Sequence, residues 1–184
     1  KFPPNFNSPY LSRDIQIFWR RWHISLSSWL RDYLYIPLGG NRKGDMRRDV
    51  NLMTTMVLGG LWHGASFNFI IWGFLHGLAL LVERTWSDHV AKRFNPMGLI
   101  GIIIGTAMTY YWVNLAWIFF RAPTLEESLS IAKTYMTFSS EGTQNLPAVV
   151  WPFILAMGVF HIISHRIKLG EMLAQIPPAR FALA

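Results

Sequence analysis

The segment from Leu52 to Val82 contains no Asp, Glu, Lys or Arg, and this run constrains the fold more than any other feature of the chain. One straight transmembrane helix needs about 20 apolar residues, and two need about 40. The run therefore fits either one long, tilted span or two shorter pieces broken near Gly59, Gly60 and Gly64. We favour the broken form, because consecutive glycines weaken a helix and broken helices in membranes line cavities.

The composition also favours a membrane protein. Charged residues make up 15% of the chain and hydrophobic residues 52%, whereas an average soluble domain has roughly 25% charged residues. The net charge is +7, and the basic residues lie mainly between apolar stretches, as is typical of membrane flanks. Nucleic acid is not expected as a partner, because the sequence has no RNA-binding motif and no zinc-finger spacing. The absence of Cys excludes disulfides, thiolate metal sites and a cysteine nucleophile.

The remaining segments extend the same interpretation. Residues 13–36 form an amphipathic helix or helix pair, because Trp, Tyr and Leu recur there at steps of three and four. The segments 98–120 and 146–164 are predicted transmembrane helices. Between them, Thr124 and Glu127 predict a capping box at the start of another amphipathic helix. The predicted fold class is all-α: a multi-helix integral membrane protein with amphipathic or re-entrant helices and at least two to four transmembrane segments.

Two histidines lie inside the charge-free run, where a polar side chain needs a hydrogen-bond partner. The glycines around His63, in "GGLWHG", would let another molecule approach the ring closely. A reactive site and a buried histidine bonded to a facing helix are equal alternatives at this point. His76 would lie about 220° around a continuous helix from His63, so a metal shared by the two is not expected and a structural role is favoured for His76.

The other polar motifs carry weaker signals. His23, in "RRWHISLSSWL", lies beside Leu26 and Leu30 on an apolar flank, which is typical of an interfacial histidine. His161 and His165 have the spacing of a metal pair but lack the glutamate of a zincin motif, so no metal site is predicted. "GGNRKG" could present N–H groups and cations to a phosphate, although a basic glycine turn is the commoner interpretation. There is no nucleophile elbow, Walker loop or dinucleotide fingerprint.

Two long motifs in order, "FWRRWHISLSSWLRDYLYIPLGGNRKG" and "NLMTTMVLGGLWHGASFNFIIWGFLHG", closely resemble the membrane-bound O-acyltransferase family. Within it, the chain is most similar to the branch of membrane subunits of bacterial alginate O-acetyltransferase. "KFPPNFNSPYLSRDI" and "WVNLAWIFFRAPTLEES" resemble the same branch. Family enzymes are much longer, so residues 1–184 are expected to be a single, partial domain from the later portion of such a protein.

The resemblance implies an enzyme that moves an acyl group from a donor to a hydroxyl without a bound cofactor, the donor being a substrate such as acetyl-CoA or an acyl carrier. The family's catalytic W-H-G histidine corresponds to His63, and a second functional histidine, in W-H-x-S-L, corresponds to His23. A neutral imidazole with a pKa of about 6.5 can accept a hydroxyl proton, so we predict His63 as the general base and His23 as an orienting or relaying group.

Closeness in sequence to His63 suggests Trp62, Asn68 and Trp72 as residues that line the site. Arg42 and Lys43 are candidates for meeting the donor's phosphates. The resemblance also implies a multi-pass protein of the bacterial inner membrane, surrounded by membrane lipid, which acts with periplasmic acetyltransferase partner proteins on an exported, alginate-like polysaccharide.

Two alternatives stay open. Within the same family, the acceptor could be peptidoglycan or teichoic acid. Outside it, a non-enzymatic transport subunit would also use intramembrane histidines and broken helices. The apolar runs contain no Asp or Glu, which such proton paths often include, and this disfavours the transport alternative.

Overall fold

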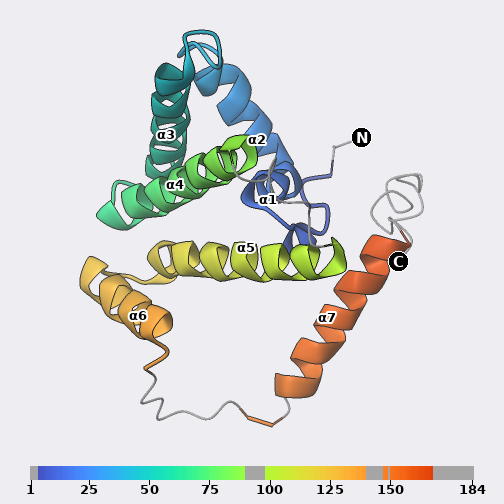
Figure 1. The fold of residues 1–184 in the computed structure, drawn as a ribbon. Coiled ribbons are helices and arrows are strands. Elements are labelled where there is room, and N and C mark those ends of the chain that lie inside the picture. The colour runs from blue at the N-terminus through green and yellow to red at the C-terminus, as the bar shows by residue number, and fades with distance from the viewer. Residues whose placement is uncertain (1–3, 90–97, 140–146, 149, 168–184) are drawn as a thin grey trace, which may run out of the picture.

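In the computed structural model, which describes residues 4–89, 98–139, 147–148 and 150–167, all regular structure is helical. In chain order the elements are a short 3-10 turn η1 (Pro9–Leu11), α1 (Ile15–Arg21), α2 (Ile24–Leu30), a π-helical turn η2 (Arg31–Tyr35), α3 (Asp45–Leu61), α4 (Phe67–His89), α5 (Gly98–Arg121), α6 (Leu125–Thr137) and α7 (Val150–Arg166). The predicted all-α class is confirmed (Figure 1).

The amphipathic region folds as separate short helices rather than as one. Asp14 begins α1, because its side chain accepts a hydrogen bond from the N–H of Ile17 at 2.7 Å. The helix ends at Arg21, and α2 is capped from the lead-in segment: Asn5 accepts from the N–H of Ile24 through its backbone and from the N–H of Ser25 through its side chain, at 3.0 and 2.9 Å. The proline-rich lead-in thus fixes where α2 begins.

The charge-free run divides between α3 and α4, which form a tight helical hairpin. Gly59 and Gly60 lie inside α3, so the break comes after the glycine pair rather than at it. A Cβ atom on Gly60 would lie 2.1 Å from the carbonyl oxygen of Phe69, and one on Gly73 would lie 2.3 Å from that of Met56. Glycine is therefore required on both helices, because their backbones touch where they cross.

Ion pairs join the other ends of the same two helices. Arg84, near the end of α4, contacts Asp49 at 2.8 Å and Asp88 at 3.6 Å. Arg48 contacts Asp45 at 2.7 Å in the first turn of α3. The hairpin is thus held by backbone contact at the glycine end and by charges at the end where α3 begins and α4 finishes.

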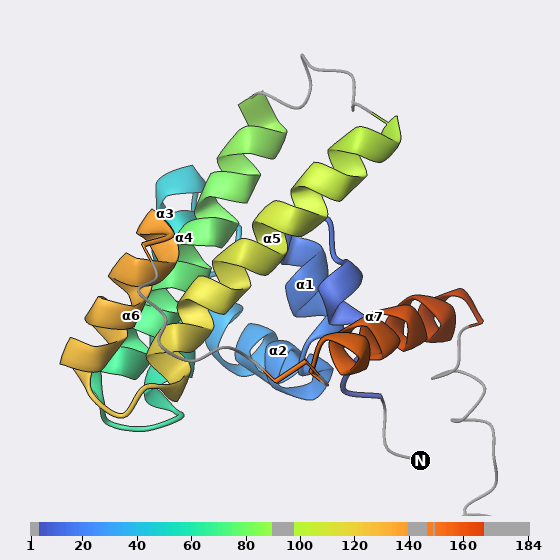
Figure 2. The same cartoon turned by 90° about the horizontal axis from the view of Figure 1, so that it is seen from below.

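The other helices pack on this hairpin, with α5 alongside α4 and α1 near both in Figure 2. The indole N–H of Trp112 in α5 donates to the carbonyl of Leu75 in α4 at 3.0 Å. On α6, Thr124 accepts from the N–H of Glu127 at 3.2 Å, which confirms Thr124 as the cap and is one of the two hydrogen bonds of the predicted capping box. The core between the helices is formed mainly by Phe18, Trp19, Trp72, Val113, Ala116 and Phe119.

Two of the described helices are long and apolar enough to cross a membrane. They are α4 and α5, with mean hydropathies of 1.2 and 1.5, and α5 covers the predicted segment 98–120. The apolar helix α7 is shorter and begins at Val150, while the predicted start of that segment at 146 lies outside the described residues. In both views α7 projects away from the other helices (Figures 1 and 2).

We predict that Gly60→Ala destabilises the protein by about 1–3 kcal/mol, because the new methyl group overlaps the backbone of α4. Gly158→Ala, in α7, is the matched control, since no atom lies within 4 Å of its added Cβ. Thermal unfolding of the purified full-length variants measures the difference. Equal unfolding temperatures for the two variants would contradict the close crossing of α3 and α4.

Candidate active site

His63 lies in the turn that connects α3 to α4. Its N–H donates to the carbonyl of Gly60 at 2.9 Å, so the chain turns immediately after α3. Gly64 follows with a φ of +156°, and a Cβ at this position would lie 2.8 Å from the ring of Phe69. The turn therefore requires glycine after the histidine and places the imidazole at the closed end of the hairpin, outside either helix.

Aromatic rings surround the half-buried imidazole of His63. Its ring centroid lies 5.0 Å from that of Phe120, 5.1 Å from Trp62, 5.3 Å from Trp72 and 6.0 Å from Phe69. Trp62 and Trp72 are among the residues predicted from sequence proximity. Phe69 and Phe120 were missed, and Phe120 comes from the far end of α5, which no local pattern connects with His63.

The structure brings His23 toward His63. Burial lowers the pKa of His63, and repulsion from the imidazole of His23 lowers it further. His63 is therefore neutral near pH 7 and able to accept a proton. The two histidines belong to different elements, and the packing of α1 against α4 brings these parts of the chain together.

His23 occupies a left-handed turn between α1 and α2, with a φ of +43°. The expectation that it lies on the apolar flank of a helix is wrong, because it stands just before the first turn of α2. Its Nδ1 atom is buried and has no hydrogen-bond partner among the described residues. Positive φ at a residue other than glycine costs on the order of 1–3 kcal/mol, and such positions cluster at functional sites.

His76 is completely buried in α4, in the aromatic core. Its ring contacts those of Trp72 and Trp19, with centroid distances of 4.8 and 5.0 Å, and stacks on Phe18. Trp72 thus contacts both His63 and His76. The angle of about 220° calculated between His63 and His76 does not apply, because the chain does not form one continuous helix from His63 to His76.

The remaining predicted residues have different surroundings. Asn68 is buried, and its amide donates to the carbonyl of Ala122 at 3.0 Å, which fastens α4 to the end of α5. Arg42 and Lys43 are exposed in the turn that precedes α3. His161 packs against Tyr10 with ring centroids 5.4 Å apart, and the side chain of His165, four residues on, lies outside the described part of the structure.

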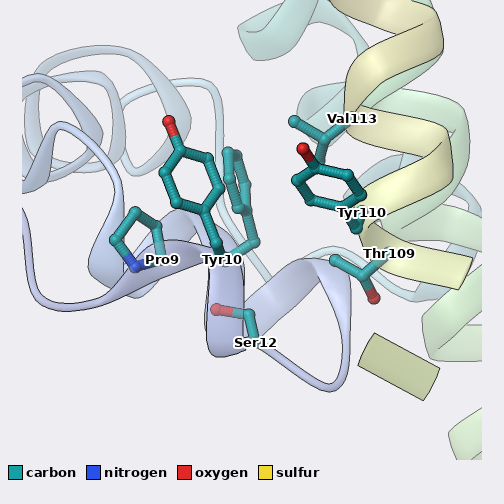
Figure 3. A pocket seen from close by; sticks show the side chains of 7 residues that line it. Pro9, Tyr10, Ser12, Thr109, Tyr110 and Val113 are labelled. Carbon is teal, nitrogen blue, oxygen red and sulfur yellow. The ribbon is translucent and has the colours of Figure 1, made fainter. Parts of the chain in front are cut away.

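Two cavities lie away from His63. The small one, between η1 and α5, is lined by Tyr10, Ser12 and Thr109 among others, and its volume of about 10 Å³ is at the limit for one water molecule (Figure 3). The larger one, of about 480 Å³, lies among α1, α2, η2, α3 and α4. Trp19 lines this larger cavity and packs on Trp72, which in turn contacts His63. The rings of Trp19 and Trp72 therefore lie between the cavity and the imidazole.

Comparison with known proteins decides the family. The membrane-bound O-acyltransferase (MBOAT) family model matches residues 2–122, which include the hairpin and both histidines of the site. The chain belongs to this family.

Several curated relatives are similar to this chain. It is 53% identical over 126 residues to a probable alginate O-acetylase, AlgI, of Pseudomonas putida, covering 68% of this chain and 24% of the relative. It is 50% identical over 133 residues to a peptidoglycan O-acetyltransferase of Helicobacter pylori, covering 72% and 25%. A teichoic acid D-alanyltransferase of Bacillus subtilis is 30% identical over 121 residues, covering 61% and 31%. The chain thus spans about a quarter of the length of the first two relatives.

The repulsion between His23 and His63 predicts that the pH dependence of activity changes when His23 is replaced. If the neutral form of His63 is active, activity falls only when the pH drops through its lowered pKa. His23→Gln removes the repulsion, so the pKa of His63 rises toward its ordinary value and the acid limb of the pH–rate profile moves to higher pH. The profile is measured on the residual activity of the full-length variant, with His89→Gln as the control. An acid limb that stays in place in both variants would contradict the interaction.

Proposed function

We propose that the full-length protein is a membrane O-acyltransferase that transfers acetyl groups to hydroxyls of an exported polysaccharide. The observation that carries the proposal is His63: a half-buried imidazole in a glycine turn, surrounded by aromatic rings, with a pKa lowered by burial. A hydroxyl is a weak nucleophile near neutral pH, and a neutral imidazole is the side chain best suited to take its proton.

In the proposed reaction, the acceptor oxygen attacks the carbonyl carbon of a thioester donor while His63 takes the hydroxyl proton. A carbon–oxygen bond forms and the carbon–sulfur bond breaks. The imidazolium then gives its proton to the departing thiolate, so that an ester and a free thiol leave and His63 is neutral again. Acetyl-CoA or an acyl carrier would be the donor, used as a substrate, and no bound cofactor is needed.

The residues around His63 would exclude water, position the imidazole and relay protons. Trp62 and Trp72, whose rings contact the imidazole, would exclude water and hold the base in place. Asn68 would position the end of α5, and with it Phe120, through its hydrogen bond to Ala122. We propose His23 as a group that orients or relays protons, which agrees with its buried, unpaired Nδ1 atom.

The remainder of the protein would complete the site. The described residues cover only part of the His63 ring, which leaves a face for a donor, an acceptor or further helices. Arg42 and Lys43 are exposed cations next to Asn41, which lines the larger cavity, so they could meet the phosphates of an incoming donor. We further propose a multi-pass protein of the bacterial inner membrane that acts with periplasmic acetyltransferase partner proteins.

The acceptor is proposed as an alginate-like polysaccharide, and one observation favours a second candidate. The chain is nearly as similar to the Helicobacter pylori relative, named for peptidoglycan, as to the Pseudomonas putida relative, named for alginate. Both polymers present sugar hydroxyls to the same chemistry. Acetyl content of each polymer in a deletion strain decides between them, since only the true acceptor loses its acetyl groups.

We predict that His63→Gln in the full-length protein lowers acetyl transfer by about 10²- to 10⁴-fold, the usual contribution of a general base. Glutamine keeps a polar side chain of similar size but cannot take the proton. His89→Gln, at the exposed end of α4, is the matched control and should leave transfer unchanged. Acetylated product and membrane levels are measured together. Normal transfer by His63→Gln would reject the role assigned to His63.

A further inference from the structure

The larger cavity is amphiphilic, and the four arginines that line it have no role in the function proposed for His63. All four charged residues that line it are arginines: Arg20 from α1, Arg31 from η2, Arg48 from α3 and Arg84 from α4. No acidic side chain lines the cavity. A volume of about 480 Å³ lies within the range of small-molecule sites, which is roughly 300–1,000 Å³.

The four arginines differ in how far their charge is already neutralised. Arg84 and Arg48 are paired with Asp49 and Asp45 at the ends of the α3–α4 hairpin. Arg31 is paired with its neighbour Asp32 at 2.7 Å. Arg20 has no ion pair within the described ranges, and its side chain is exposed. It is therefore the guanidinium most able to bind an incoming anion.

The deeper walls of the cavity are apolar. They include Leu52 and Met56 of α3, Leu80 of α4 and Leu30 of α2. Trp19 contributes another wall, and its buried indole N–H has no hydrogen-bond partner in the described structure. A ligand suited to these walls carries a flexible apolar part, while its charged group stays near the arginines.

Along α3 and α4, the charged and the apolar lining residues lie in the same order as the headgroups and the acyl chains of a bilayer. The candidate span α4 ends at His89, so Arg84 lies near its end and Leu80 lies one turn closer to its middle. On α3, Arg48 lies in the first turns, and Leu52 and Met56 follow at one-turn intervals. With α4 across a bilayer, Arg84 and its neighbour Arg48 would lie at the level of the lipid headgroups, and Leu80, Leu52 and Met56 would lie at the level of the acyl chains.

We propose that this cavity binds a phosphate ester with a flexible apolar tail, with the phosphate held by Arg20 and Arg31 and the tail along Leu52, Met56 and Leu80. Guanidinium groups suit phosphate because they donate several hydrogen bonds in one plane. The headgroup and acyl chain of an anionic membrane lipid present this chemistry, whereas the phosphopantetheine arm of a thioester carries two amide groups in place of an apolar tail. The site is separate from His63, and its occupancy is measured without acyl transfer.

The test titrates the purified full-length protein, in uncharged detergent, with dioleoylphosphatidylglycerol and separately with coenzyme A. We expect Arg20→Gln to weaken the binding of dioleoylphosphatidylglycerol on the order of tenfold, through loss of a charge-assisted hydrogen bond, and we expect coenzyme A, which carries no apolar tail, not to bind in the cavity. Arg47→Gln is the matched control, because Arg47 is exposed on α3 and does not line the cavity. Leu80→Trp should abolish binding by filling the apolar part while keeping every charge.

Each outcome decides the proposal. Binding of phosphatidylglycerol that is weakened by both Arg20→Gln and Leu80→Trp supports the lipid site, whereas binding of coenzyme A with the same sensitivity would overturn it. The proposal is overturned if neither probe binds, or if Arg20→Gln and Arg47→Gln weaken binding equally. Unfolding temperatures without probe confirm that the variants are folded before their affinities are compared.

Discussion

The contact of α3 with α4 at Gly60 and Gly73 is the constraint on which the rest of the structure depends. An added Cβ at either position would overlap a carbonyl oxygen of the other helix, so no larger side chain fits without moving the backbones apart. Because the helices touch here, the chain must reverse direction within a few residues. That short turn is where His63 lies, and its position follows from the crossing.

The same crossing sets the chemical surroundings of the imidazole. It brings Trp72 of α4 to the ring of His63, and the hydrogen bond from Asn68 to Ala122 holds the end of α5, with Phe120, on another side. Aromatic rings disfavour a charged imidazolium because they replace water around it. Burial thus lowers the pKa of His63 and keeps the imidazole neutral near pH 7, although the residue is only half-buried.

Much of this arrangement could be predicted from sequence, because it rests on local patterns. The charge-free run predicted apolar helices, and Thr124 with Glu127 predicted the start of α6. In both cases the physical cause lies within a few residues of the pattern. The glycines around His63 were predicted to let another molecule approach the ring, but at Gly60 and Gly64 the space beside the backbone is taken by the carbonyl and the ring of Phe69.

Contacts that depend on tertiary packing could not be predicted in this way. Phe120 reaches His63 only because α5 lies along α4, and no spacing in the sequence encodes that distance. His23 was assigned to a helix flank, but the capping of α2 by Asn5 leaves it in a left-handed turn. The angle calculated between His63 and His76 assumed a continuous helix, and the turn between them removes that assumption.

Chemical rescue tests most directly whether His63 is the base. His63→Gly in the full-length protein leaves space beside Trp72 and Phe120 for a free imidazole. If His63 takes the acceptor's proton, added imidazoles should restore acetyl transfer, and the rescued rate should rise with the pKa of the imidazole's conjugate acid when compared per neutral molecule. Transfer that is undiminished in His63→Gly, or rescued rates that do not depend on that pKa, would contradict the role of His63.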